Sequence, residues 1–436
     1  MSDQKHSLEE RLKAHPHLKQ RIEKLLEIVE DASGDIDKAD EAEQRVIEEL
    51  QRLGNEVLHD WAQHKETVKV NEYNQSNDKS KRHGKKKIIW HTTFGEIKIF
   101  EQAFLLDGKF IRPFSTVAKV QCRGYSQPLQ RRITDFGADV SFGKIPQKLK
   151  EHYGITIPES SGRNITEGHA GLIRKQEKIN TKIPDRAGVD CIIAGMDGSM
   201  VPIVDVDGTR KDKRKTRSVR WKEARLALAH SKGSVDPVFG ATLGDTEDAG
   251  DYLAHCCICA GIGTNTTVHC VGDGAPWIFD QVDRVFGTQA EFLIDFYHLC
   301  DYLSAASKIC APDNSIKWFE KQKDLMKDNQ VTAVLQKLMP HIESDSVPDK
   351  DAPVRRCYRY IRNRPFQFNY KEALGRGLPI GSGEVESAHR YVIQDRLKIA
   401  GAWWKEDNAQ NMLSLRTFRQ NGDWESYWTE CRKKAA

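Results

Sequence analysis

The sequence contains no long hydrophobic run, and this absence excludes a membrane-spanning helix. Its apolar stretches are as short as Cys191–Ala194, whereas a helix that crosses a bilayer needs about 20 apolar residues. The opening residues, MSDQKHSLEERLK, also lack the apolar segment that follows the basic start of a secretory signal peptide. We therefore expect a cytoplasmic protein.

A disulfide framework is also absent. The ten cysteines are scattered without regular spacing, a pattern that favours reduced thiols. One local cluster, His255-Cys256-Cys257-x-Cys259, allows two interpretations. It has two types of zinc ligand but no second ligand pair at zinc-finger spacing, and its surroundings predict a buried helix in which small thiols are core residues.

The chain has little net charge, and a value of +4 does not by itself indicate a nucleic-acid partner. The basic residues are nevertheless clustered. Residues 79–87 contain six Lys or Arg and residues 210–220 contain seven. Such blocks are either solvated linkers or surfaces that contact phosphates.

A chain of 436 residues is long enough for roughly two to four domains. Changes in composition predict six segments. They are a helical hairpin (1–66), a basic linker with a β segment (67–126), a helix-turn-helix region (127–187), an α/β core (188–301), a charge-rich helical insertion (302–378) and the C-terminal helices of the core (379–436).

The first segment has apolar residues at helical spacing. Ile47, Leu50, Val57, Leu58 and Trp61 recur on one face of a predicted helix, and residues 18–29 have a similar stripe. The hairpin either packs on the body of the protein or forms a dimerisation arm.

Residues 127–187 carry a helix-turn-helix pattern. Ile145 and Leu149 belong to a short predicted helix, Gly154 makes a turn, and a second helix that contains Arg163 begins near Ser160. The second helix of such a motif can enter the DNA major groove. Many two-helix corners have the same pattern, so a purely structural role stays open.

After Asp190, predicted strands and helices alternate. We expect strands at 191–196, 200–206 and 218–229, a helix at 248–260, a strand at 267–271, a helix at 276–286 and a strand at 291–295. Three strands, a helix, a strand, a helix and a strand is the order of an RNase H-like α/β sheet.

Three acids fall at informative places in this pattern. Asp197 is predicted to end the first strand, Asp273 follows a later strand, and Glu386 lies in the first turn of a helix. Such carboxylates can hold two Mg²⁺ or Mn²⁺ ions about 3.5–4 Å apart. Each acid taken alone is unremarkable, because an Asp-Gly after a strand is usually a turn and a Glu at a helix start usually serves the dipole.

The segments GDGAPW, IDFYHLCDYL, LPIGSGEVESAHRYVIQDRLKIAGAWW and WESYW resemble bacterial insertion-sequence DDE transposases of the ISKra class, and more distantly Mutator-type transposases. The resemblance extends over roughly residues 88–430. It implies that Asp197, Asp273 and Glu386 are the catalytic, metal-binding acids. It further implies two-metal cleavage and joining of DNA ends, with terminal inverted repeats and target DNA as partners, a homodimer or higher oligomer, and a nucleoid-associated protein.

The third acid has a rival two residues earlier. Glu384 and Glu386 point about 200° apart on a helix, and a Ser or Thr four residues before the catalytic Glu in related families corresponds to Ser382. We therefore prefer Glu386. Similar families also carry the D-x-x-H motif found here at Asp295 and His298, which we expect to support the site or to be structural.

Basic residues near the third acid are candidates for DNA contacts. Arg390, Arg396 and Lys398 follow Glu386, and near a metal site they could clamp phosphates. The second basic block adds Lys211, Lys213, Arg214 and Lys215. Two alternative functions stay open, which are a non-catalytic DNA-binding protein derived from a transposase and a nuclease of the same fold without strand transfer.

Overall fold

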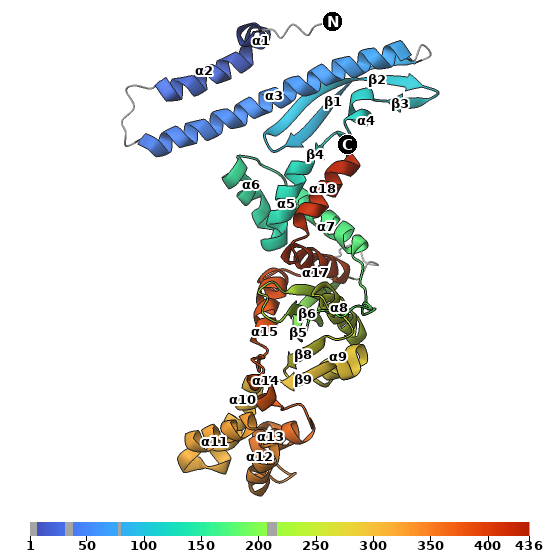
Figure 1. Ribbon diagram of the computed structural model, residues 1–436. Helices are drawn as coiled ribbons and strands as arrows, with labels where there is room; N and C mark the ends of the chain where they lie inside the picture. The colour runs from blue at the N-terminus through green and yellow to red at the C-terminus, as the bar shows by residue number, and fades with distance from the viewer. Residues whose placement is uncertain (1–6, 31–37, 77–79, 207–215, 436) are drawn as a thin grey trace. The chain divides into compact units, whose positions relative to one another are not determined.

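The computed structural model describes residues 7–30, 38–76, 80–206 and 216–435, which fold into two compact units. One unit comprises residues 1–166 and 426–436, and the other comprises residues 167–425. Both contain a β-sheet and several helices, so the protein is of mixed α and β structure (Figure 1). Within the described ranges, every helix is too short or too polar to cross a membrane.

The first unit begins with three helices, of which the third packs on a small sheet. Its helices and strands are α1 (Leu8–Ala14), α2 (Pro16–Glu30), α3 (Ala39–Ser76), β1 (Lys81–Thr92), β2 (Gly95–Leu106), β3 (Lys109–Ile111), α4 (Pro113–Val117) and β4 (Gly124–Tyr125). The sheet order is β3-β2-β1-β4. Ala62 of α3 and Ile88, Ile97 and Ile99 of the sheet are fully buried together, and this small core fixes α3 on the sheet.

A second helical group has the predicted helix-turn-helix elements. They are α5 (Gln127–Asp139), α6 (Ile145–Tyr153) and α7 (Glu159–Gln176), of which residues 167–176 belong to the second unit. Ile145 and Leu149 are fully buried against Leu129 and Ile133 of α5. Gly154 ends α6 in the left-handed conformation with a φ of 63°, which a residue without a side chain adopts at low cost. α18 (Trp424–Ala435) is the last helix of the chain.

The second unit is built on a five-stranded sheet with the order β7-β6-β5-β8-β9. Its strands and the two helices between them are β5 (Cys191–Val206), β6 (Arg217–Ser231), β7 (Val238–Thr242), α8 (Thr246–Cys259), β8 (Thr267–Gly272), α9 (Pro276–Phe286) and β9 (Ala290–Ile294). β6 pairs antiparallel with both β5 and β7, whereas β5, β8 and β9 are parallel. Parallel neighbours need a crossover, and α8 and α9 provide it.

Helices cover the two faces of this sheet. α8 and α9 bury the even-numbered side chains of β5, including Ile192, Ala194 and Met196, and Cys256 and Cys257 of α8 belong to the same core. On the other face, α15 (Gly383–Ala388) approaches Gly195, where an added Cβ would lie 3.4 Å from Val385. The remaining C-terminal helices are η8 (His389–Gln394), α16 (Asp395–Leu397) and α17 (Glu406–Gln420).

The segment 302–378 contains helices and no strand. Its helices, with the helix that leads into it, are α10 (Phe296–Cys310), α11 (Ser315–Lys327), α12 (Val331–Leu338), α13 (Pro353–Arg362) and α14 (Tyr370–Gly375). They share one core with Leu293 and Ile294 of β9. The helical segment is therefore packed onto the sheet edge.

Two predictions about strands are wrong. The chain does not turn at Gly198, because β5 continues from Cys191 to Val206 and pairs with β6 over its whole length. β7 was not predicted, although it pairs with β6 at the other side. Pairing with β6 explains both differences, because the backbone N–H and C=O groups of β6 can bond to a partner strand whatever side chains that partner carries.

The prediction that the segment 67–126 begins with a basic linker is also wrong. α3 continues to Ser76, and β1 begins at Lys81 within the basic block. Residues 81–87 are exposed yet paired with β2. This part of β1 is exposed on both faces and tolerates lysines, because the ladder of backbone hydrogen bonds does not depend on the side chains.

Candidate active site

Three aspartates follow one another across the carboxyl ends of the parallel strands. Gly195 of β5 is paired with Val271 of β8, and Gly272 of β8 is paired with Ile294 of β9. Continuing both registers beyond the last pairs brings Asp197 opposite Asp273, and Asp273 opposite Asp295. Asp197 thus lies inside strand β5, but just past the point where β5 separates from β8.

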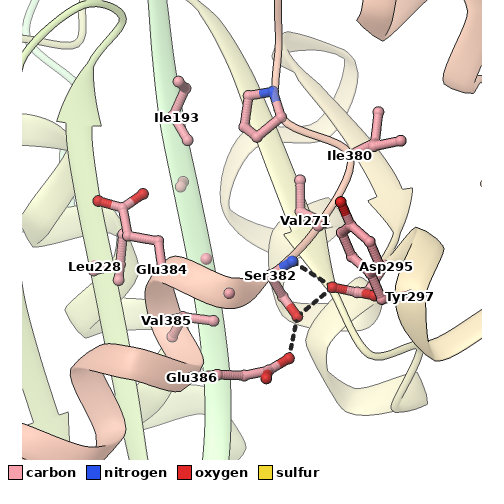
Figure 2. Close-up of a pocket in the computed structure, with 15 residues that line it drawn as sticks. Ile193, Leu228, Val271, Asp295, Tyr297, Ile380, Ser382, Glu384, Val385 and Glu386 are labelled. Atoms are coloured by element: carbon pink, nitrogen blue, oxygen red, sulfur yellow. Dashed lines mark hydrogen bonds between the residues drawn. The ribbon is translucent and has the colours of Figure 1, made fainter.

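Glu386 reaches this edge from helix α15 through Ser382. The Ser382 Oγ lies 2.7 Å from Glu386 Oε1 and 2.7 Å from Asp295 Oδ2, so its single hydroxyl hydrogen can be donated to either carboxylate. The backbone N–H of Ser382 also donates to Asp295. Figure 2 shows this chain of contacts from Asp295 through Ser382 to Glu386. Asp295 is buried and lies within hydrogen-bond distance of both the N–H and the hydroxyl of Ser382. It therefore positions the start of the helix that carries Glu386.

Asp197 is held by a histidine that the sequence did not single out. His389 is buried in η8, a π-helical turn of the kind often found at functional sites. Its Nε2 donates to the backbone oxygen of Asp197 over 2.8 Å and lies 3.7 Å from Asp197 Oδ2. Burial lowers the pKa of His389, while the neighbouring Asp197 raises it, and the ring donates a hydrogen bond to Asp197.

The charge environment of Asp197 links the three acids. Burial raises the pKa of Asp197 above its ordinary value, the nearby His389 ring and the Gly198 N–H lower it, and the negative charges of Asp273 and Glu386 raise it. A cation bound beside three neighbouring carboxylates stabilises their ionised forms, because it offsets the repulsion between them.

The loop that carries Asp273 is braced by the helical segment. Tyr360 of α13 donates to the backbone oxygen of Asp273 over 2.8 Å, and Arg364 donates twice to the oxygen of Gly274. Gly274 has a φ of 86°, and a Cβ there would lie 2.9 Å from atoms of both Tyr360 and Arg364. Asp273 Oδ1 accepts from the N–H of Ala275 over 2.8 Å. Sequence patterns gave no signal for this brace, because the partners are almost ninety residues apart.

Glu384 and Glu386 point in different directions (Figure 2). Glu384 Oε2 lies 3.1 Å from Nε2 of His230 on β6, whereas Glu386 points toward Ser382. His298 belongs to the same group as Glu386, since its Nε2 lies 3.9 Å from Glu386 Oε1 and its backbone N–H donates to Asp295 Oδ1. The D-x-x-H motif therefore lies beside Glu386.

A cavity of about 500 Å³ opens next to these side chains. Its walls come from β5, β6, β8 and the loop before α15, with Asp295, Ser382, Glu384 and Glu386 as polar lining and Ile193, Val271 and Ile380 as apolar lining. The side chain of Glu386 is 52% exposed and that of Asp197 is 28% exposed. Both are thus accessible from solvent.

The predicted DNA contacts have different surroundings. Arg390 and Arg163 are exposed, and Lys398 is exposed with its Nζ 2.6 Å from Ser199 Oγ on β5. Arg396 is only 1% exposed and its guanidinium lies 4.6 Å from the ring centre of Trp404. The prediction that Arg396 contacts DNA is therefore wrong, because its charge is inside the unit. Lys211, Lys213, Arg214 and Lys215 lie outside the described residues.

Divalent ions with hard oxygen ligands suit the residues at this edge. Asp197, Asp273 and Glu386 offer carboxylate oxygens only. Their ligand atoms are not all within 4.8 Å of one another. Two ions about 4 Å apart, each about 2.1 Å from its ligands, need oxygens spread over up to about 8 Å. A convergent two-ion site stays a prediction for the metal-bound protein.

The cysteine cluster is part of the core. Cys256 and Cys257 are fully buried in α8, and burial raises the pKa of both thiols. His255 and Cys259 lie at the surface with Nε2 and Sγ 3.7 Å apart. The buried thiols thus have the packing role that was one of the two interpretations.

Comparisons with known proteins give a partial family match. Residues 262–433 match the model of an uncharacterised protein family (UPF0236), which is less than half of the chain but includes Asp273, Asp295 and Glu386. No curated protein matches the sequence significantly. A solved structure titled "Crystal structure of NurA with manganese" is 12% identical over 63% of this chain and 66% of that chain, slightly under two thirds of its length. Its TM-score of 0.09 carries no structural argument.

Proposed function

We propose that this protein is a DDE-type DNA transposase that cleaves and joins the ends of its insertion sequence. One observation carries the proposal. Asp197 and Asp273 lie at the carboxyl ends of neighbouring parallel strands, and Glu386 reaches the same edge through Ser382 and Asp295. Three mutually repelling carboxylates are costly to keep without a cation, and metal-dependent phosphoryl transfer gives them a purpose.

The fold supports the same proposal. The elements β5, β6, β7, α8, β8, α9 and β9 make three strands, a helix, a strand, a helix and a strand, although the first three strands are not the three that the sequence predicted. Such an α/β sheet with its acids at the ends of parallel strands is what we propose to be an RNase H-like core. Ligands of parallel α/β sheets bind at the carboxyl ends of the strands.

Asp197, Asp273 and Glu386 would hold two Mg²⁺ or Mn²⁺ ions. When bound, such ions activate an attacking oxygen and stabilise the leaving oxygen of a phosphodiester. The protein contributes the fixed geometry. His389 and the Gly198 N–H hold Asp197, Tyr360 and Arg364 hold the loop of Asp273, and Ser382 orients Glu386.

The proposed reaction has two steps on DNA. Hydrolysis at the ends of the element frees a 3′-hydroxyl, which then attacks a phosphodiester of the target. His298 beside Glu386, together with the exposed Arg390 and Lys398, is suited to contact the phosphates during both steps. α6 and α7, with Arg163, would bind the terminal repeats as a helix-turn-helix motif.

Joining two ends requires at least a dimer, and α3 has a surface that fits this need. Ile47, Leu50, Val57 and Trp61 are each 43–53% exposed on this helix, whereas Leu58 packs on the sheet. An exposed apolar stripe at this spacing is suited to pair with a second copy.

The decisive experiment compares two glutamates of the same helix. Glu386→Gln keeps the shape of the side chain but removes a metal-binding charge, so cleavage and strand transfer of end-containing DNA should fall to background. Binding to the terminal repeats should persist, because it rests on the basic residues. Glu384→Gln is the matched control and should keep substantial activity, since Glu384 faces His230. The assays are run with Mg²⁺ and with Mn²⁺.

Each outcome separates the alternatives. If wild-type protein binds the ends but cleaves nothing, it is a DNA-binding protein without catalysis. If it cleaves without joining, it is a nuclease of the same fold. If both variants remain active, the third ligand lies elsewhere and the triad assignment is wrong.

A further inference from the structure

Three metal-ligand side chains meet at the start of the chain, outside the proposed active site. His15 ends α1, His17 lies in the first turn of α2, and Asp60 belongs to α3. His15 Nδ1 lies 3.0 Å from Asp60 Oδ2, and His17 Nε2 lies 2.9 Å from the same oxygen. In the described part of the chain, this is the one group of three whose ligand atoms all lie within 4.8 Å of one another.

The chemistry of this group suits a transition-metal ion. Two imidazole nitrogens and one carboxylate oxygen are typical ligands of Zn²⁺ and its neighbours, whereas Mg²⁺ prefers oxygen alone. Ligands about 2.0–2.1 Å from a tetrahedral Zn²⁺ ion are roughly 3.3–3.4 Å apart. Small shifts of the three atoms would therefore admit an ion, with water at the remaining position.

The local backbone holds both histidines ready. Pro16 lies between them and restricts the residue before it to extended conformations, and His15 has a φ of −131° and a ψ of 71°. Asp60 lies on the 38-residue helix α3. This helix is held in place near Asp60, because Ala62, two residues further along, is fully buried. Binding would thus order few additional side chains, which lowers its entropic cost.

Two ion pairs already connect the same helices. Arg21 of α2 donates to Glu56 over 2.8 Å and lies 3.4 Å from Glu49. Together with the contact between His17 and Asp60, these ion pairs show that α2 runs antiparallel to α3, with the first turn of α2 beside Asp60. An ion at the histidines would close the open end of this pair.

We propose that His15, His17 and Asp60 bind one divalent transition-metal ion of the Zn²⁺ class, which clips the junction of α1 and α2 onto α3. The site is independent of the proposed catalytic ions, because it uses nitrogen ligands and lies in the other compact unit. Its role is structural, since it fastens the helices that flank the exposed stripe of α3.

The test measures binding of Zn²⁺ to the full chain by calorimetry and of Co²⁺ by visible absorption. The protein carries Asp197→Asn, Asp273→Asn and Glu386→Gln, so that the acids at the sheet edge do not contribute. We expect one Co²⁺ site with absorption typical of nitrogen and oxygen ligands and without thiolate charge transfer, which excludes the exposed Cys122 and Cys259.

Ligand variants decide the assignment. His15→Ala with His17→Ala should weaken the site by at least about 100-fold, as loss of direct ligands must exceed the effect of losing residues behind them. Asp60→Asn, which keeps the side-chain shape, should also weaken it. The control is His64→Ala, which removes an exposed histidine of the same helix and should change nothing. Unchanged affinity in the double variant, with unchanged helical circular dichroism, would overturn the proposal.

Discussion

Asp197 is the residue at which stability and the proposed chemistry conflict. Its carboxylate is partly buried beside two other acids, and burial raises its pKa. A raised pKa in the folded state contributes stability that is fully present below the unfolded value, about 3.9. This stability is lost as the pH rises through the folded pKa.

We therefore expect Asp197→Asn to stabilise the metal-free protein at neutral pH. The melting temperature in the presence of a chelator should be higher for the variant at pH 7, and the difference should shrink as the pH falls through the raised pKa. Asp205→Asn, on the exposed part of the same strand, is the control. An equal or lower melting temperature for Asp197→Asn at pH 7 would show that the Asp197 carboxylate does not destabilise the folded protein at that pH.

Some residues of the candidate site can be predicted from the sequence alone, and others cannot. Acids near strand ends and a helix start form a rare combination, and this combination predicts Asp197, Asp273 and Glu386 as candidate metal ligands. His389, Tyr360 and Arg364 were not found, because each acts through a backbone oxygen of a distant residue. Arg396 was misjudged since a basic residue beside a site looks the same whether its charge is exposed or stacked on a buried ring.

At the scale of elements, local pattern predicted most helices, and pairing decided the strands. The helices near residues 145, 160, 248 and 276 and the helical segment after residue 302 are present. Strand β5 contains two glycines and a proline, yet it stays paired with β6 to Val206. β1 is rich in lysine, yet β2 pairs with it from Lys81 onward. In both cases the next strand along the chain supplies the pairing.

The exposed stripe of α3 supports a prediction about assembly. Leu50 is 49% exposed between Ile47 and Val57. Leu50→Glu should weaken dimerisation, because an ionised carboxylate in an apolar helix pair is costly to bury. Asn71→Glu adds the same charge to the same helix outside the stripe and should have no effect.

The measurement is analytical ultracentrifugation over a range of concentrations. A monomeric wild type, or a Leu50→Glu protein that dimerises as strongly as Asn71→Glu, would exclude this stripe as the dimer contact. Far-ultraviolet circular dichroism checks that both variants keep their helices.

At the scale of the whole second unit, the helical segment is part of the site. Tyr360 and Arg364 connect it to the loop of Asp273. Tyr360→Phe keeps the stacked contact with Tyr302 but removes the hydroxyl that bonds the Asp273 oxygen. We expect cleavage to fall roughly 10–100-fold, the usual effect of losing a residue that orients a ligand.

The control for this variant is Tyr358→Phe on the same helix, which should keep wild-type activity. The rate of end cleavage is measured at saturating Mn²⁺ and over a range of Mn²⁺ concentrations. A Tyr360→Phe protein with an unchanged rate and metal dependence would show that the brace has no part in catalysis.

The groups that hold the aspartates of the candidate site are synthesised after the aspartates themselves. Tyr360 comes 87 residues after Asp273, Ser382 comes 87 residues after Asp295, and His389 comes 192 residues after Asp197. Because a chain emerges from the ribosome amino end first, all three aspartates leave it well before the groups that hold them. A nascent chain that ends before residue 382 would then carry these aspartates without Ser382 and His389, and the proposed cleavage would require both groups to be synthesised.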